Sequence, residues 1–305
     1  MQAFRTTLST PEFDFDISHN DRIFCIGSCF AEHMAQKLRK NKFETYLNPF
    51  GILYNPISIK KTLQSLLEKN QFTKDHLFIN QGLWHSFDHH GSFSTPNKSE
   101  TLLGINDAFN KGQAFLRQTT RLIVTLGTAN VFVHKKSGKI VANCHKLPGI
   151  EFERKRLSVE KIVEQLSLVF EKIKNQNSDL QIITTVSPIR HIRDGLIENQ
   201  KSKAVLLLAL DEICRNLDFV HYFPSYEIMQ DDLRDYRFYE ADLVHPNDLA
   251  IEYIWDIFKQ AFFNKNTLEL IAKIEKIVTA SQHRPFHQAS DQHQHFLIDQ
   301  LKNIA

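Results

Sequence analysis

Three side chains that lie far apart in the sequence could together carry out acyl transfer. Ser28 follows Gly27 where an apolar stretch gives way to a helical pattern, and Asp242 and His245 stand three residues apart near the other end of the chain. A serine hydroxyl becomes an effective nucleophile when an imidazole takes its proton, and a carboxylate that orients the imidazole improves the base. We therefore predict Ser28 as nucleophile, His245 as base and then acid, and Asp242 as the group that orients His245.

The elements around Ser28 should place its hydroxyl at the edge of a parallel sheet. Residues 22–26 suit a buried strand, and Phe30, Met34 and Leu38 recur at helical spacing after Ser28. The hydroxyl would then lie at the C-terminal edge of the sheet, where open α/β sheets bind ligands, and at the positive end of a helix. Serine is also a common N-cap, so a purely structural role is the alternative interpretation.

Short apolar runs alternate with helical patterns over most of the chain. The runs occupy residues 22–26, 43–47, 121–126, 180–186 and 218–223, and the clearest helical patterns occupy 157–173, 204–214 and 247–262. Such alternation is typical of a parallel sheet covered on both faces. We predict an α/β protein, a three-layer α/β/α sandwich with a mainly parallel five-stranded sheet.

Three regions do not fit this alternation. Residues 130–143 contain a Lys-Ser-Gly-Lys turn between apolar segments and predict a hairpin insertion, whereas residues 77–95 predict a long ordered loop. After residue 264 we expect a helix with Leu268, Ile271, Ile274 and Val278 on one face, followed by a polar Gln/His-rich tail at residues 282–295. The predicted domains are therefore a hydrolase-like domain at 1–264 and a C-terminal helix with a polar tail at 265–305.

The composition narrows the possible functions. The 305 residues carry a formal net charge of +2, which gives no reason to expect nucleic acid as a partner. No apolar stretch approaches the roughly 18 residues that span a bilayer, and the first residues lack the pattern of a secretory signal. The four cysteines form no CxxC pair and are expected to be reduced thiols. A soluble protein without a cofactor, cytoplasmic by default, is expected, and the sequence gives no oligomeric state.

An acyl-transfer site also needs hydrogen-bond donors for the oxyanion. The backbone N–H groups of Ser28 and Gly51 are candidates, and so is the strand end around Gly127 and Asn130. Asn143 and His145 could fold back to the same edge after the predicted hairpin. Ser187 and His191 follow another strand, and Trp84, His85, Ser86 and His89 could form a substrate wall.

Two other chemistries are alternatives. A metal-dependent hydrolase could draw on the abundant imidazoles and one carboxylate, although no HExxH spacing appears; these residues are His85, Asp88, His89, His90, His145, His191 and His245. Cys29 could replace Ser28 as the nucleophile. Adjacent helical residues point about 100° apart, so only one of the two can face His245.

Several sequence blocks resemble a known family. They are GSCFA at residues 27–31, NPFGILYNP at 48–56, LGTANVF at 126–132, NCHKLP at 143–148, TVSPIRH at 185–191, and FPSYEIMQDDLRDYRFYEADLVHP at 223–246. The chain is similar to the GSCFA domain family, which resembles the SGNH, or GDSL-like, hydrolases.

The resemblance implies a flavodoxin-like topology and a serine hydrolase that cleaves or transfers an acyl ester, with a small molecule or carbohydrate as substrate. It implies Ser28 as nucleophile, Gly51 as oxyanion glycine, and Asp242 with His245 as the terminal pair. Where the third block usually supplies asparagine, this chain has Ala129, and Asn130 follows one residue late. That departure motivates another alternative, a non-catalytic glycan-binding module on the same fold.

Overall fold

The central sheet has five parallel strands in the order β10-β9-β5-β1-β2. The computed structural model describes residues 5–68 and 71–282. The strands of this sheet are β1 (Arg22–Gly27), β2 (Glu44–Leu47), β5 (Arg121–Leu126), β9 (Gln181–Val186) and β10 (Val220–Tyr222). In order of appearance within the sheet this is the 2-1-3-4-5 arrangement of flavodoxin-type proteins, whose ligands bind where the winding reverses, here between β1 and β5.

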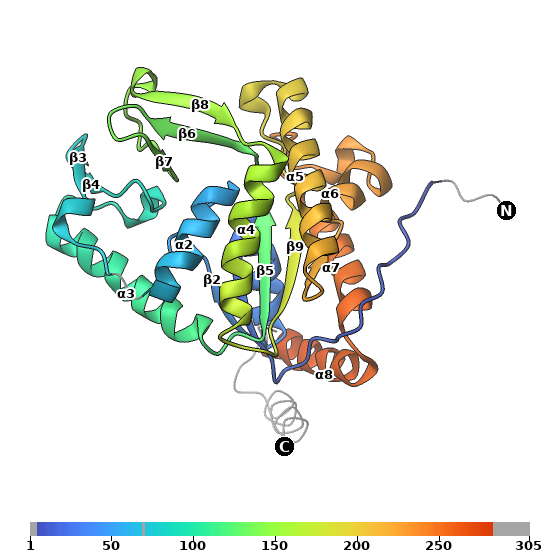
Figure 1. The fold of residues 1–305 in the computed structure, drawn as a ribbon. Helices are drawn as coiled ribbons and strands as arrows, with labels where there is room; N and C mark the ends of the chain where they lie inside the picture. The colour runs from blue at the N-terminus through green and yellow to red at the C-terminus, as the bar shows by residue number, and fades with distance from the viewer. Residues whose placement is uncertain (1–4, 69–70, 283–305) are drawn as a thin grey trace, which may run out of the picture.

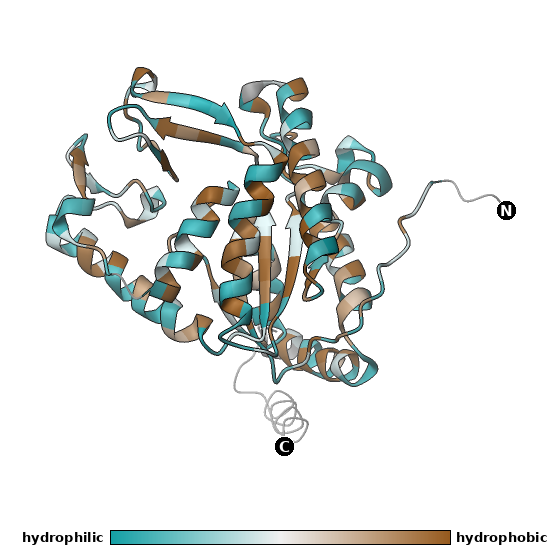
Figure 2. Ribbon diagram, in the orientation of Figure 1, coloured by the Kyte–Doolittle hydropathy of each residue, from teal (hydrophilic) through white to brown (hydrophobic). Residues whose placement is uncertain are grey.

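Helices cover both faces of this sheet (Figure 1). The long helices are α1 (Cys29–Lys40), α2 (Pro56–Glu68), α3 (Lys98–Leu116), α4 (Val159–Lys174), α5 (Leu196–Asn216), α7 (Asp248–Phe262) and α8 (Lys265–Gln282), and α6 (Ser225–Glu227) is one short turn. Alternate strand residues face opposite layers: Phe24 packs with α2, α4 and α5, whereas Cys25 packs with α1 and α7. Figure 2 shows the resulting hydrophobic strands between helices whose outer faces are hydrophilic. The predicted three-layer sandwich is confirmed.

All five strands predicted for the central sheet are present, and their ends differ from the predicted ends by no more than two residues. Ser158 caps α4 by accepting a hydrogen bond from the Lys161 N–H at 3.2 Å. The helical pattern at residues 247–262 becomes α7, which begins one residue later than predicted and is preceded by Pro246 and Asn247. Asn247 is the N-cap of that helix and accepts from the Ala250 N–H at 3.1 Å.

The predicted hairpin belongs to a larger insertion between β5 and α4. Strands β6 (Asn130–His134) and β7 (Lys139–Val141) pair antiparallel as expected, and β8 (Phe152–Arg156) pairs with the other side of β6. We call residues 130–156 the β6–β8 module. The predicted loop at residues 77–95 also contains a small hairpin, β3 (Phe78–Asn80) with β4 (Leu83–His85).

The C-terminal helix exists as predicted, but fewer of its apolar side chains are buried against the rest of the protein than the pattern predicted. Within α8, Ile271 is 3 % exposed, whereas Leu268 is 37 % exposed and does not join the expected apolar face. Residues 283–305, which hold most of the predicted polar tail, lie outside the described residues. None of the helices in the described part of the chain is long and apolar enough to cross a membrane.

Candidate active site at the carboxyl edge of the sheet

Ser28 lies in a tight turn between β1 and α1. Gly27 has a φ of +140°, and a Cβ added there would lie 2.1 Å from the Thr125 carbonyl oxygen, so only glycine fits. The Ser28 N–H donates to that same oxygen at 3.2 Å. The Ser28 hydroxyl is the N-cap of α1 and accepts from the Phe30 N–H at 3.3 Å. The predicted strand-to-helix turn is therefore present, and it lies at the reversal point between β1 and β5.

The segment after β2 crosses the ends of β1 and β5. Asn48 accepts the Gly27 N–H at its Oδ1 at 2.8 Å, and the Leu53 N–H donates to the Gly27 carbonyl at 3.0 Å. The Tyr54 carbonyl then accepts from the Gly127 N–H at 2.7 Å. These bonds link the C-terminal ends of β1 and β5, and we call this end of the sheet the carboxyl edge. The backbone around Ser28 is therefore held by β5 on one side and by the 48–55 segment on the other.

The N–H groups predicted to stabilise an oxyanion already have acceptors. Ser28 and Gly127 donate as described above, and the Gly51 N–H donates to the Asn48 carbonyl at 2.8 Å. Gly51 does need its glycine, since its φ is +79° and a Cβ would lie 2.3 Å from His90 Cβ. Close packing on the His90 loop explains this glycine. At the start of α1, the Cys29 N–H donates to no backbone carbonyl of the described residues and faces its own thiol. The N-terminus of a helix is a favourable place for an anion.

Asp242 and His245 form the pair that the sequence predicted. The Asp242 Oδ2 lies 2.6 Å from His245 Nδ1, and its Oδ1 accepts the N–H groups of His245 and Val244, each at 2.9 Å. The hydrogen bonds from the His245 backbone and ring, with that from Val244, lower the pKa of Asp242 to about 2. The carboxylate thus stays ionised at neutral pH and holds the ring through Nδ1, and among the described residues no hydrogen bond engages Nε2.

The loop that carries this pair is strained and externally supported. Leu243 has a φ of +58°, which is unusual for a bulky side chain and tends to occur at functional sites. The Arg190 guanidinium donates to the Leu243 carbonyl and lies 4.6 Å from the centre of the Tyr239 ring. Arg190 therefore fixes the loop from the segment that follows β9.

Two neighbouring histidines place His245 beside the carboxyl edge. Burial lowers the pKa of His33 on α1, and the His245 ring is among the nearby charges that lower it further. Burial also lowers the pKa of His191 to about 4, with smaller contributions from Lys203 and His245. A Cβ added at Gly127 would lie 3.0 Å from His191 Nε2, so this ring adjoins the end of β5. The carboxylate-imidazole pair is thus within electrostatic reach of both α1 and the β9 loop.

In the described part of the chain, no hydrogen bond joins the two parts of the predicted triad. Ser28 is 2 % exposed, whereas the His245 side chain is 43 % exposed. Among the described residues, the Ser28 hydroxyl has its hydrogen bond with the Phe30 N–H and none with His245. Catalytic hydrogen bonds are often long in the absence of substrate and tighten when it binds.

Asn143 and His145 have hydrogen-bond partners in their own segment and in the 85–89 loop. His145 is 6 % exposed, its Nε2 lies 2.7 Å from the Ser86 carbonyl, and its ring centre lies 4.5 Å from that of His85. Burial lowers the pKa of His145 to about 4. Asn143 accepts the His145 N–H at 2.8 Å. These contacts fasten the segment after β7 to the 85–89 loop, and a role of the two residues in an oxyanion or substrate site stays a prediction.

Asn130 and the predicted substrate wall are also mostly enclosed. Asn130 begins β6 opposite Arg156 and is 8 % exposed. His85, Ser86 and His89 are 7 %, 3 % and 0 % exposed, respectively, so they pack beneath the surface. Among the described residues, no three His, Cys, Asp or Glu side chains gather closely enough to hold a metal ion.

Sequence reasoning missed several polar residues of this edge. Lys203 on α5 is 1 % exposed, its Nζ donates to the Ser187 carbonyl at 2.7 Å, and burial lowers its pKa to about 7. Ser202 bonds the Ala129 N–H at 2.7 Å. Asn48 keeps its Nδ2 buried without a partner among the described residues. From sequence alone, a lysine or serine within a helical pattern is expected on the exposed face. Lys203 and Ser202 are buried because α5 packs against the strand ends.

The strand order, the turn at Ser28 and the acid-imidazole loop define a doubly wound α/β protein with a polar site at the carboxyl edge. The model of the GSCFA family matches residues 22–258, and that of the GSCFA domain protein C-terminal domain matches residues 274–305. The chain therefore belongs to the GSCFA family. Comparison with curated proteins finds no match.

Proposed function

We propose that this protein is a serine hydrolase of the SGNH type, which cleaves or transfers an acyl ester through an acyl-enzyme on Ser28. The observation that carries the proposal is the Asp242–His245 contact of 2.6 Å, whose imidazole lies within electrostatic range of His33 on α1. His245 takes the Ser28 proton as the hydroxyl attacks the ester carbonyl, and then returns a proton to the leaving alcohol. Water attacks the acyl-enzyme in the second half of the cycle, with His245 again as base.

The start of α1 is the part of the site that suits the oxyanion. The Cys29 N–H and the positive end of the helix favour negative charge there. Lys203 lies within electrostatic range of the Cys29 side chain, and in the protonated form that predominates below about pH 7 it would add positive charge to this part of the site. This arrangement would serve in place of the asparagine that the chain lacks at Ala129.

Cys29 is a second candidate nucleophile because it is partly exposed, whereas Ser28 is buried. Burial raises the pKa of the Cys29 thiol, however, so little thiolate would form at neutral pH. The raised pKa of the Cys29 thiol therefore favours Ser28 as the nucleophile. A non-catalytic glycan-binding module is the other alternative, and the engaged N–H groups of Gly51 and Gly127 favour it.

A fluorophosphonate probe distinguishes the serine hydrolase from the two alternatives, a Cys29 nucleophile and a non-catalytic module. The probe should label the wild-type protein on Ser28, as located by peptide mass spectrometry, and should label the Cys29→Ala variant as well. The Ser28→Ala variant should remain unlabelled. Label on another residue, or a folded wild-type protein that takes no label and does not hydrolyse p-nitrophenyl acetate, would rule out the serine hydrolase.

A further inference from the structure

Tyr54 lies at the carboxyl edge, and its backbone is fixed there. Its carbonyl oxygen accepts the N–H groups of Gly127 and Thr128 at 2.7 and 3.0 Å. A Cβ added at Gly127 would lie 2.6 Å from Tyr54 Cβ, so the glycine leaves the space that the tyrosine side chain occupies. The side chain of Tyr54 therefore begins directly over the end of β5.

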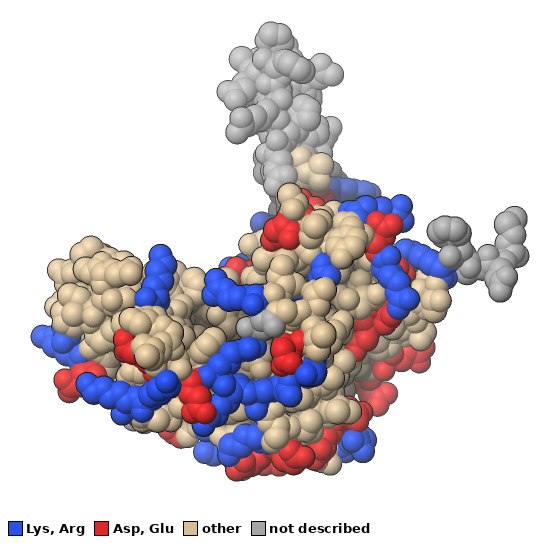
Figure 3. Space-filling model, turned by 90° about the horizontal axis from the view of Figure 1, so that it is seen from above, with Lys and Arg blue, Asp and Glu red and all other residues tan. Residues whose placement is uncertain are grey.

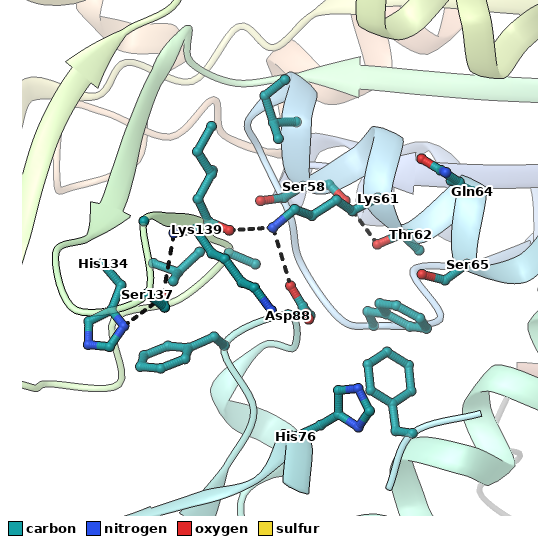
Figure 4. Close-up of a pocket in the computed structure, with 18 of the residues that line it drawn as sticks. Ser58, Lys61, Thr62, Gln64, Ser65, His76, Asp88, His134, Ser137 and Lys139 are labelled. Carbon is teal, nitrogen blue, oxygen red and sulfur yellow. Dashed lines mark hydrogen bonds and ion pairs between the residues drawn. The ribbon is translucent and has the colours of Figure 1, made fainter. Parts of the chain in front are cut away.

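The helix that follows this tyrosine keeps it in position. Asn55 Oδ1 accepts the Ser58 N–H at 2.9 Å, as the cap of a helix does. One turn further along α2, Lys61 Nζ donates to the Ile140 carbonyl at 2.5 Å and lies 3.8 Å from Asp88 Oδ1 (Figure 4). These contacts hold α2 against the β6–β7 hairpin, so the residues just before the helix have little freedom to move.

The Tyr54 ring is supported by the loop after β9. Its centre lies 5.4 Å from that of the His191 ring, with an angle of 51° between the two planes. His191 is itself fixed, because its N–H donates at 2.9 Å to Oδ1 of Asn199, which is 2 % exposed. The ring of Tyr54 thus lies between the end of β5 and a neighbour that cannot easily move.

Among the described residues, no hydrogen bond engages the Tyr54 hydroxyl. The residue is 36 % exposed, so a ligand can reach the side chain. Five other tyrosine hydroxyls are engaged: Tyr46 with the Ala108 carbonyl, Tyr222 with Glu227, Tyr226 with Gln200, Tyr239 with Gln230 and Tyr253 with Asp232. A phenol without a partner at the carboxyl edge is available to donate to a bound molecule.

The Tyr54 hydroxyl also lies within electrostatic range of the start of α1. Burial raises the pKa of Tyr54, and neighbouring Cys144 raises it further; Arg193 opposes the rise, and Cys29 adds to it. The phenol therefore keeps its proton at neutral pH. Figure 3 looks onto the carboxyl edge and shows Lys and Arg side chains around the hollow in this face, which favour a negative charge that develops there.

We infer that Tyr54 is a further catalytic residue, whose hydroxyl donates a hydrogen bond to the ester carbonyl oxygen as Ser28 attacks it. The inference rests on the proposed hydrolase. Tyrosine hydroxyls can serve as oxyanion donors, and a hydrogen bond to a developing negative charge is stronger than one to a neutral carbonyl. Tyr54 keeps its proton throughout, while His245 takes and returns the proton of Ser28. The side-chain donor that is missing at Ala129 is thus supplied from the segment before α2.

Tyr54→Phe separates the hydroxyl from the ring. It should lower kcat for p-nitrophenyl acetate about 10²-fold and change KM less than about twofold, because only a transition-state contact is lost. Tyr46→Phe is the matched control, since it removes a hydroxyl that donates to the Ala108 carbonyl at 3.1 Å, and it should keep kcat within about twofold. A wild-type kcat in Tyr54→Phe would overturn the inference.

Inhibition by phenylboronic acid tests the same contact through a tetrahedral adduct with Ser28. The inhibition constant for Tyr54→Phe should rise at least about tenfold, because such an adduct resembles the transition state. Equal inhibition of the variant and the wild type would contradict a donor role. A wild-type protein without turnover that depends on Ser28 would overturn the hydrolase and this inference together, whereas an active wild type matched by Tyr54→Phe would overturn this inference alone.

Discussion

The two parts of the candidate active site are built in opposite ways. Ser28 is 2 % exposed and sits in a turn whose backbone is hydrogen-bonded to β5 and flanked by the 48–55 segment. The side chains of Asp242 and His245 are 49 % and 43 % exposed and lie on a loop with a strained Leu243. One part is fixed by the sheet, and the other is held by a few contacts that can change.

This difference indicates where adjustment must occur for catalysis. Moving Ser28 would break hydrogen bonds of the central sheet, whereas moving the 242–245 loop would break the Arg190 contact and the bonds that Leu243 and His245 form with the Glu240 backbone. We therefore expect the imidazole to approach the hydroxyl when substrate binds. Loops on a rigid scaffold commonly supply such motion.

The largest expected effect comes from the fixed part. Ser28→Ala should lower kcat/KM for p-nitrophenyl acetate by at least about 10³-fold, because the nucleophile is lost. The same change should lower the free energy of unfolding by only about 1 kcal/mol through loss of the N-cap. Cys29→Ala is the control and should keep most of the activity. A reversed pattern would identify Cys29 as the nucleophile.

The two parts should also tolerate backbone changes differently. Gly27→Ala should lower the free energy of unfolding by about 3 kcal/mol or more, because the new Cβ would collide with the Thr125 carbonyl. Leu243→Gly should alter it by less than about 1 kcal/mol, since relief of the positive φ offsets the entropy of glycine. Urea unfolding of both variants measures the contrast, and similar losses would show that the loop is as rigid as the turn.

Substitution of Arg190 tests how the 242–245 loop is held in place. Arg190→Ala should reduce kcat/KM about tenfold, a typical effect of a misplaced catalytic group, while changing stability little. Arg190→Lys keeps the charge but loses the planar stacking, and should recover only part of the activity. Full activity in the alanine variant would show that the loop positions His245 without this support.

The smallest effect concerns pH and the Asp242 carboxylate. Its pKa is about 2 in the folded protein, against 3.8 for an unperturbed aspartate, so its contribution to stability is present above about pH 4 and is lost as the pH falls toward 2. The melting temperature of Asp242→Asn should lie below wild type by at most a few degrees at pH 5, since the site is exposed. The two curves should converge by about pH 2; a constant gap would contradict the assignment.

The central fold was predictable because its strands are continuously apolar, as in residues 121–126, and its helices carry clear periodic faces. Strand β8 was not, since its sequence FERKR shows no apolar alternation. It becomes a strand by pairing with β6 along its whole length. The short strands β3 and β4 were hidden for a similar reason, in a segment without a clear period.

The parts of the site that depend on residues close together in the sequence were predictable. The parts whose hydrogen-bond partners depend on tertiary packing were not. Asp242 and His245 are three residues apart, so one loop suffices to bring them together as predicted. The occupied N–H groups of Gly51 and Gly127 depend on the path of the 48–55 segment, which no pattern revealed. His145 resembled a catalytic residue in sequence, yet its partners come from a loop about sixty residues earlier.

The β6–β8 module leaves and rejoins the body at a single place, where the Leu157 N–H donates to the Ala129 carbonyl at 2.9 Å. An excursion closed at its base in this way can lengthen, shorten or be exchanged while the central strands keep their register. Because Ala142 and His145 also form hydrogen bonds with the 85–89 loop, an exchange of residues 130–156 between relatives would have to include that loop as well.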